Sequence, residues 1–284
     1  MIRSLKYIKS RIRGIENTKK VTSAMQMISV AKLNRAEKML YSFRPYFLKF
    51  QTLLYSTINS QDQITHPFFN NAINTEKLCL CVITSDGGLC AAYNNNIITY
   101  AENFIKEIGR ERIDLVCVGR KGYNYFKKRD YSIINSYLGL NGRFKDNIVL
   151  DITNILVELF TSGSYNKVYI AYTHFETALI HKPKIEKFLN LDNMMDRKID
   201  YIFEPEAEVI LNEIVPRYVY LKLKLIILEA FTAEHSIRAV AMKMATDNAK
   251  ELLEGLNLLK NKVRQANITQ ELMEVISSSE ALKG

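Results

Sequence analysis

The stretch that decides the fold is LIILEAFTAEHSIRAVAMKMATDNAKELLEGLNLLKNKV, residues 225–263. Twelve of its positions recur at alternating spacings of three and four, and eight of those twelve are apolar. Such a repeat is typical of a coiled coil, so it predicts a helix that packs along its length against another helix. The twelve positions are Leu225, Leu228, Thr232, His235, Ala239, Met242, Thr246, Ala249, Leu253, Leu256, Lys260 and Val263.

The N-terminal stretch, residues 1–44, is the expected partner of that helix. Glycine and proline are nearly missing from residues 1–44 and 217–283, which contain only Gly14 and Gly255. At 1.5 Å per residue, continuous helices of these lengths would measure about 65 and 100 Å, and helices so long need a partner along their length. We therefore expect the two ends of the chain to form an antiparallel coiled coil.

The apolar stripe of the N-terminal helix is expected to change phase. It begins at a regular spacing with Ile8, Ile12 and Ile15, and the next apolar residues no longer fit that spacing. The shift predicts a break in the heptad near Thr18, followed by a second apolar stripe. The second stripe consists of Val21, Met25 and Ile28.

The middle of the chain predicts an inserted α/β domain. Short β-branched or aromatic runs alternate there with helix-like segments, which favours a Rossmann-like domain with a mostly parallel sheet. The expected strands are residues 78–84, 114–118, 131–138 and 167–173, and the expected helices are residues 96–108, 122–129 and 146–160. The predicted division is an N-terminal shaft helix (1–60), an inserted domain (75–205) and a C-terminal shaft helix (206–284).

Composition excludes several classes of protein. With 48% apolar residues, the chain can bury a core and is not a disordered tail. Its apolar runs, such as residues 78–83, are far shorter than the roughly 20 residues of a membrane-spanning helix. The opening MIRSLKYIKSRIRG is too charged for a signal peptide, so we expect the chain to stay on the cytosolic side.

The net charge of +9 belongs to the N-terminal segment. Residues 1–60 carry 12 basic and 2 acidic side chains, a net of +10, which leaves a net of −1 for all later residues. Such a segment could face nucleic acid, an anionic membrane or an acidic protein. Residues 8–40 lack interleaved aromatic side chains, and their apolar stripe is committed to a helix partner. Binding to nucleic acid or to a membrane surface is therefore disfavoured.

Three motifs could carry chemistry, and for each a structural role is favoured. TSDGGLCAAYNNN, residues 84–96, follows an expected strand, yet its glycines lack the dinucleotide-binding spacing and the chain has no Gly-Lys-Ser/Thr loop. If the chain were an enzyme that acts on a phosphorylated small molecule, its ligand would have to bind at this segment. His174, near Glu176 and His181, is the best acid/base candidate. The clustered cysteines favour reduced core thiols over a zinc site; they are Cys79, Cys81, Cys90 and Cys117.

Segments from three separate regions of the chain resemble one family, the γ subunits of F-type ATP synthases. Residues 8–27, IKSRIRGIENTKKVTSAMQM, are similar to the family's N-terminal helix, and TSDGGLC is similar to its first strand and turn. AVAMKMATDNAKEL and VRQANITQELMEVI, residues 239–252 and 263–276, resemble its C-terminal helix. The family usually carries glycine where this chain has Ala91 and Ala92, and a Gly-Gly-Ala-rich run where it has Ser277 to Glu280.

The resemblance implies a central rotor shaft that couples ion-driven rotation of the c-subunit ring to conformational cycling of the catalytic β subunits. The implied partners are the α and β subunits of the head, the ε subunit and the c ring, without nucleic acid and without membrane insertion. The chain itself would be no enzyme and would hold no cofactor or metal. It would lie peripherally on the cytoplasmic side of a cell inner membrane or, alternatively, on the matrix side of an organellar inner membrane.

The resemblance also implies which residues contact those partners. One group near the C-terminus would hydrogen-bond to loops of the surrounding catalytic subunits, a second would lie on the facing N-terminal side, and a third would touch the c ring. The groups are Arg264, Gln265, Thr269 and Glu271; Lys9, Lys20 and Met25; and Tyr201 and Glu204.

Overall fold

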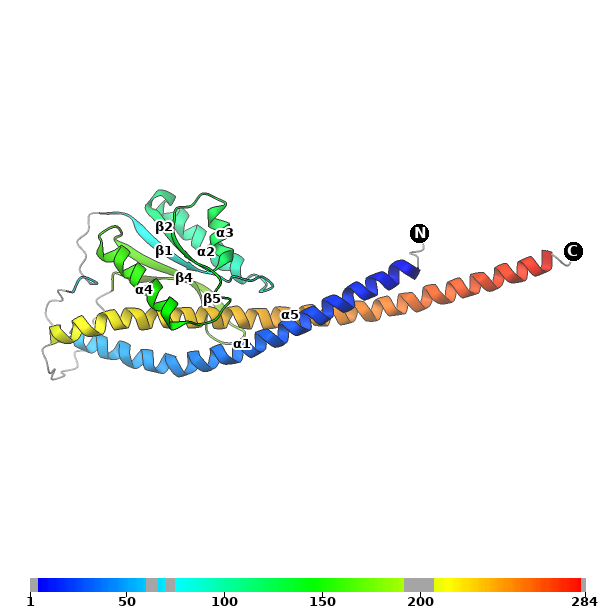
Figure 1. Cartoon of the computed structure of the whole chain (residues 1–284), viewed down its shortest axis with the longest axis horizontal. Helices are drawn as coiled ribbons and strands as arrows, with labels where there is room; N and C mark the ends of the chain where they lie inside the picture. Colours follow the sequence, from blue (N-terminus) through cyan, green and yellow to red (C-terminus); the bar gives the residue numbers. More distant parts are fainter. Residues whose placement is uncertain (1–4, 60–65, 70–74, 192–206, 282–284) are drawn as a thin grey trace. The chain divides into compact units, whose positions relative to one another are not determined.

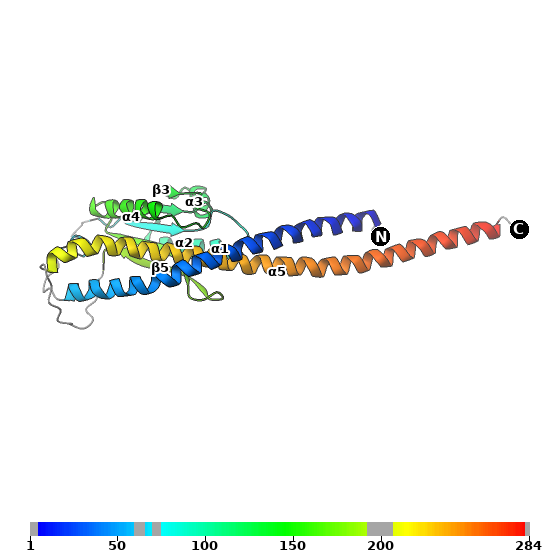
Figure 2. The ribbon, with the colours of Figure 1, turned by 60° about the horizontal axis from the view of Figure 1, so that its bottom comes forward.

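The computed structural model describes residues 5–59, 66–69, 75–191 and 207–281 (Figures 1 and 2). The chain divides into a terminal unit, Met1–Ile28 with Ala239–Gly284, and a central unit, Ser29–Arg238. In chain order the elements are α1 (Leu5–Asn59), β1 (Leu78–Ile83), α2 (Tyr93–Ile108), η1 (Arg110–Arg112), β2 (Ile113–Val118), α3 (Arg120–Lys127), β3 (Ile133–Tyr137), α4 (Asp146–Thr161), β4 (Lys167–Phe175), β5 (His181–Leu189) and α5 (Ala207–Ala281).

The terminal unit is a pair of antiparallel helices, formed by the start of α1 and the end of α5. Ile8, Ile12 and Leu253 are buried together, and Ile15 packs against them. Farther along α1, Thr22 meets Thr246, so residue numbers rise on one helix as they fall on the other. The predicted packing of Ile8, Ile12 and Ile15 against the C-terminal helix is confirmed.

The interface between these helices keeps its heptad phase, so the predicted break near Thr18 was wrong. After Ile15 the buried position of α1 is Thr22, whereas Val21 and Ile28 are 58% and 57% exposed. The Thr246 hydroxyl donates to Thr22 Oγ1 over 2.8 Å, which satisfies both polar groups inside the interface. Small polar side chains therefore fill heptad positions that apolar residues usually occupy, and hydrophobicity alone misplaced the stripe.

Both long helices pass through a proline that borders one of the breaker-poor stretches, residues 1–44 and 217–283. Pro45 lies inside α1 and Pro216 inside α5. A proline in a helix interior removes one backbone hydrogen bond and costs about 3 kcal/mol. Each proline is followed by a buried aromatic residue, Phe47 on α1 and Tyr218 on α5, and these two rings stack with their centroids 5.6 Å apart. Packing on either side holds the helices together across the prolines.

The central unit is built around a five-stranded sheet in the order β3-β2-β1-β4-β5. β1 to β4 are all parallel to one another, which confirms the predicted mostly parallel α/β sheet. Alternate residues of β1 point to the two faces of the sheet. Leu80 and Val82 pack with side chains of α2 and α3, while Cys81 and Ile83 pack in a larger core with α4, α1 and α5. The sheet is thus covered on both faces.

The fifth strand, β5, runs antiparallel to β4 and is absent from the sequence prediction. Its sequence, HKPKIEKFL, carries three lysines and a proline, which lowers its apparent strand propensity. Those residues suit the edge of a sheet, since lysine and proline discourage pairing with a further strand. Pairing with β4 therefore determines the strand conformation of this segment, which its local sequence does not predict.

Candidate functional site

The four C-terminal residues expected to contact partners all lie exposed on the last turns of α5. Arg264 and Gln265 are followed one to two turns later by Thr269 and Glu271. The Thr269 hydroxyl donates to the Gln265 carbonyl oxygen over 3.0 Å, a bond within the helix that leaves the Gln265 side chain free to point outward. The structure thus brings this group together on one short length of helix.

The same length of α5 also exposes apolar side chains. Ile268, Leu272 and Val275 are 48%, 58% and 66% exposed, and their spacings of four and three place them on one side of the helix. Of the side chains that the structure describes, the last apolar one of α5 that packs against α1 is Val263. Among the described residues, the end of α5 presents an amphipathic surface.

The three residues expected on the N-terminal side lie along α1. Lys9 and Lys20 are exposed and Met25 is half-buried. Sequence reasoning missed the exposed apolar residues close to them, of which Met27 is 71% exposed and Ile28 57% exposed. Their poor fit to the heptad was the available signal, because apolar residues outside the repeat point away from the coiled-coil interface. Tyr201 and Glu204 lie outside the described residues.

The turn after β1, which was the candidate ligand loop, is held by its own side chains. The Asp86 carboxylate accepts hydrogen bonds from the backbone N–H groups of Arg120, Gly139 and Asn141 at 3.0, 2.9 and 2.7 Å. It therefore ties together the loops that follow β1, β2 and β3. Ala91 in this turn has φ of 44°, a conformation that favours glycine.

Side chains of α5 occupy the carboxyl end of the sheet, where open α/β sheets usually bind ligands. Arg238 donates from Nε to the Gly88 carbonyl oxygen over 3.1 Å and pairs with Glu234 at 2.8 Å. His235 Nε2 lies 2.9 Å from the Gly142 carbonyl oxygen. Burial raises the pKa of Glu234 and lowers the pKa of His235 to about 4. These contacts attach α5 to the loops at the carboxyl end of the sheet.

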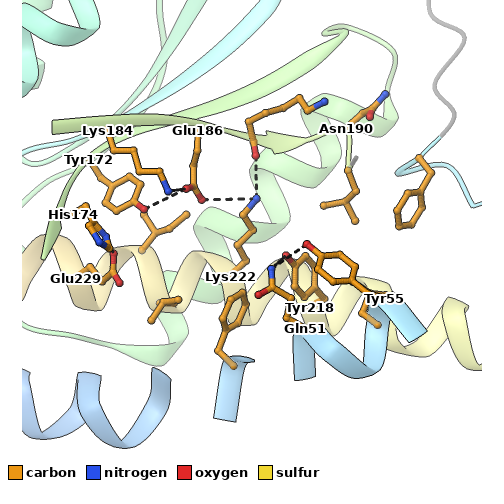
Figure 3. A pocket seen from close by; sticks show the side chains of 17 residues that line it. Gln51, Tyr55, Tyr172, His174, Lys184, Glu186, Asn190, Tyr218, Lys222 and Glu229 are labelled. Carbon is orange, nitrogen blue, oxygen red and sulfur yellow. Dashed lines mark hydrogen bonds and ion pairs between the residues drawn. The ribbon is translucent and has the colours of Figure 1, made fainter. Parts of the chain in front are cut away.

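A second cluster forms a pocket of about 450 Å³ between the helices α1 and α5 and the strands β4 and β5, called here the polar pocket (Figure 3). Its charged groups include Glu186, which lies 2.6 Å from Lys184 Nζ and 3.8 Å from Lys222 Nζ. The lining residues are Phe47, Gln51, Leu54, Tyr55, Phe69, Tyr172, His174, Lys184, Glu186, Lys187, Asn190, Leu191, Tyr218, Lys222, Leu225, Ile226 and Glu229.

His174, the acid/base candidate, belongs to this pocket through a partner that sequence could not reveal. Its Nδ1 lies 2.6 Å from Glu229 Oε2, and Arg44 pairs with the other oxygen of Glu229 at 2.7 Å. The neighbouring Glu176 instead pairs with Lys182. Glu229 thus connects α1, β4 and α5, which gives His174 a structural partner 55 residues away in sequence.

The four cysteines are all buried as free thiols. Burial raises the pKa of Cys79 and Cys117 to about 12, which keeps both protonated at neutral pH. No three potential metal-ligating side chains gather within the described ranges. None of the described helices has the length and apolar character needed to cross a bilayer.

Comparison with known proteins places the chain among homologues along its whole length. The family model described as ATP synthase matches residues 4–282. The ATP synthase gamma chain of Chlorobium phaeobacteroides is 35% identical, covering 99% of both chains, and that of Salinibacter ruber is 36% identical, covering 99% of this chain and 98% of the relative.

Two solved structures share the fold. A chain of the Euglena gracilis mitochondrial ATP synthase (OSCP/F1/c-ring, rotational state 3) aligns with a TM-score of 0.65 at 17% identity, covering 98% of this chain and 94% of that one. A chain of the Tetrahymena thermophila mitochondrial ATP synthase central stalk and c-ring aligns with a TM-score of 0.60 at 21% identity, covering 79% of this chain and 99% of that one.

Proposed function

The chain belongs to the family of ATP synthase gamma chains, and from this premise we propose how its surfaces serve the central stalk. As a gamma chain it is the non-catalytic rotor shaft of an F-type ATP synthase, which couples ion-driven rotation of the c ring to conformational cycling of the catalytic β subunits. Its partners are the α and β subunits, the ε subunit and the c ring. The observation that carries this function is the match to gamma chains over 99% of the sequence.

The end of α5 is the surface we assign to the catalytic head. Arg264 and Glu271 are seven residues apart, and Gln265 and Thr269 four, so each pair lies on nearly one side of the helix. Charge-assisted hydrogen bonds from such side chains are worth about 1.5–3 kcal/mol each where water is excluded. Bonds of this size can favour one catalytic subunit over its neighbours and still break at each rotation step.

The exposed apolar residues beside this group supply the other half of the contact. Ile268 and Leu272 would lie against apolar surfaces of the head while Arg264 and Glu271 find polar partners there. On α1 we assign Lys9, Lys20 and Met25 to the facing side of the head. Tyr201 and Glu204 are assigned to the c ring by family resemblance alone.

We also propose where the chain works and how its length is divided. A gamma chain is a peripheral subunit of a membrane complex; we place this one on the cytoplasmic side of a bacterial inner membrane, with the matrix side of an organellar membrane as the alternative. The two relatives named above, from Chlorobium phaeobacteroides and Salinibacter ruber, are bacterial, which favours the first. Residues 1–60 and 206–284 serve as the shaft, and residues 75–205 serve as the domain beside the c ring.

The test of the assignment is the double variant Arg264→Ala with Gln265→Ala, reconstituted with the other subunits. We expect an intact complex with lower ATP turnover or less proton pumping per ATP. The variant would lose the side-chain hydrogen bonds between α5 and the catalytic head, while the helix itself stays intact. Lys243→Ala with Asn248→Ala is the matched control, since it also removes one cation and one amide from exposed positions of α5. Assembly, turnover and pumping are measured on one preparation.

Each outcome has a separate meaning. If the Arg264/Gln265 variant assembles and matches the parent in both rates, these residues are only solvated helix surface. If the full chain fails to co-assemble with α and β subunits at all, the function itself is refuted. A loss of equal size in the control variant would also refute the assignment, because the effect would then not be specific to Arg264 and Gln265.

A further inference from the structure

Asn141 and Gly142 form the only Asn-Gly pair in the sequence. They occupy the middle of a tight turn between β3 and α4, in which the Arg143 N–H donates to the Leu140 carbonyl oxygen over 2.9 Å. Both have positive φ angles, 51° and 63°, which asparagine and glycine adopt more readily than other residues do. Asn-Gly is also the pair in which the backbone nitrogen of the second residue most easily attacks the side chain of the first, because glycine puts no side chain in the way.

The fold requires glycine at position 142. A Cβ atom there would lie 2.5 Å from Cε1 of His235, which is closer than packing allows. The Gly142 carbonyl oxygen lies 2.9 Å from His235 Nε2, and the Asn141 N–H donates to Asp86 Oδ2 over 2.7 Å. The contacts that attach α5 to this loop therefore retain a chemically reactive pair.

Both reacting groups of the pair are accessible. The Asn141 side chain is exposed, and its Nδ2 donates to the Gly139 carbonyl oxygen over 3.1 Å. The Gly142 N–H donates no hydrogen bond to the part of the chain that the structure describes, so a base in solution can take its proton. In β3, by contrast, the Ser136 N–H donates to Oδ1 of the preceding Asn135 over 2.7 Å. Asn135 therefore serves as a reference for Asn141.

Lys32 of α1 favours loss of that proton. Its Nζ donates to the Asn141 carbonyl oxygen over 3.1 Å, and this oxygen belongs to the same peptide group as the Gly142 nitrogen. When the nitrogen loses its proton, negative charge spreads onto the oxygen. A cation that is hydrogen-bonded to the oxygen stabilises this charged form and makes the nitrogen a better nucleophile.

We propose that Asn141 converts to isoaspartate and aspartate in water, without an enzyme, and that Lys32 promotes the reaction. Hydroxide removes the Gly142 N–H proton, and the nitrogen forms a bond to Asn141 Cγ. The bond between Cγ and Nδ2 then breaks, and Nδ2 leaves as ammonia with a proton from water, so that a cyclic imide remains. Water adds to either carbonyl carbon of the imide and breaks the bond from that carbon to the Gly142 nitrogen, which gives aspartate or isoaspartate.

The products would weaken the attachment of α5 to this loop. Isoaspartate lengthens the main chain by one carbon atom, so the Asn141 N–H and the Gly142 carbonyl oxygen no longer reach Asp86 and His235 together. Either product also adds a negative charge beside the Asp86 carboxylate, which repels it. Conversion of one residue therefore loosens the central unit as the protein ages.

The test incubates the purified full chain at neutral and mildly alkaline pH and follows each asparagine by peptide mapping with mass spectrometry. We expect the modified fraction at Asn141 to be at least tenfold that at Asn135, and to rise with pH because the attacking nitrogen must lose its proton. Hydrogen exchange of the Arg120 and Gly139 amides, which donate to Asp86, should become at least tenfold faster in the modified chain. The readout is a covalent change in the isolated chain, so it is independent of the function proposed above.

Three variants separate the turn from general ageing of the chain. Lys32→Met should slow the conversion at least threefold, and Lys38→Met, at an exposed position of α1, should not. Asn141→Gly removes the reactive side chain and permits the same backbone angles, so its amide exchange should stay constant on storage. Circular dichroism verifies that each variant folds.

Three results would overturn the proposal. The first is an intact Asn141 in the folded chain under conditions that modify the urea-unfolded chain, because the turn would then protect the residue. The second is equal modification of Asn141 and Asn135. The third is an equal rate in the parent and in Lys32→Met, which would remove Lys32 from the reaction.

Discussion

His235 is a residue whose charge state is set by the fold. Burial is the main reason that its pKa is lowered to about 4; the nearby Arg238 and Lys32 charges act in the same direction, and the Gly142 carbonyl opposes them. In the unfolded chain an ordinary histidine has a pKa of about 6.5. Between these two values the unfolded chain takes up a proton that the folded chain refuses, so folding stability falls as the pH falls from about 6.5 towards 4.

We predict that His235→Gln removes part of this pH dependence. At about 1.4 kcal/mol per pKa unit, the histidine accounts for roughly 2–3 kcal/mol of stability lost between pH 7 and pH 4.5. Urea unfolding of parent and variant at both pH values measures the difference. The neighbouring Glu234, whose raised pKa acts in the opposite direction, is present in both chains. Identical losses in the two chains would show that His235 is not buried as a neutral base.

Glu229 is a buried carboxylate of α5 that links α5 to α1 and β4 in the central unit. It is 4% exposed and receives Arg44 from α1 and His174 from β4. Glu229→Gln should cost about 3 kcal/mol of unfolding free energy, because the Arg44 charge would lose its only carboxylate within the described residues. Glu213→Gln, an exposed position on the same helix, is the control and should change stability by less than about 0.5 kcal/mol. Thermal unfolding that ranks the two variants equally would contradict the prediction.

At the scale of elements, the terminal unit depends on which side of α1 faces α5. Ile12 is 9% exposed and Ile28 is 57% exposed, although both are isoleucines on one helix. Ile12→Asp should cost at least about 3 kcal/mol, since it places an unpaired carboxylate in the interface. Ile28→Asp should leave the unfolding free energy nearly unchanged. If chemical unfolding shows equal losses for both, the interface does not follow the heptad described above.

The elements also show where sequence was sufficient. Periodicity found both long helices, and β-branched runs found β1 to β4, because each signal is local. The prediction of the heptad phase failed at Thr22, because a pair of hydroxyl groups replaces apolar contact there. The prediction also missed β5, because pairing with β4 outweighs the low strand propensity of its lysines and proline. The polar pocket was beyond prediction, since its residues come from α1, β4, β5 and α5 and share no spacing.

For the whole molecule, the division of chemistry between subunits gives a direct prediction: the purified chain neither binds ATP at micromolar concentration nor hydrolyses it. The sequence has no Gly-Lys-Ser/Thr loop, and Glu234, His235 and Arg238 occupy the end of the sheet where a nucleotide would lie. Calorimetry with MgATP measures this, and binding with a micromolar Kd would contradict it.

The pairing of Thr22 with Thr246 has a consequence for how the protein is made. These partners are 224 residues apart. A ribosome adds about 5–20 residues per second, so the first helix waits roughly 10–45 s before its partner is synthesised. During that interval Ile8 and Ile12 have nothing to cover them, and the loop that must close is nearly the whole chain. We therefore expect the terminal unit to be the last part to fold, and the nascent N-terminal helix to be the segment that chaperones must shield during translation.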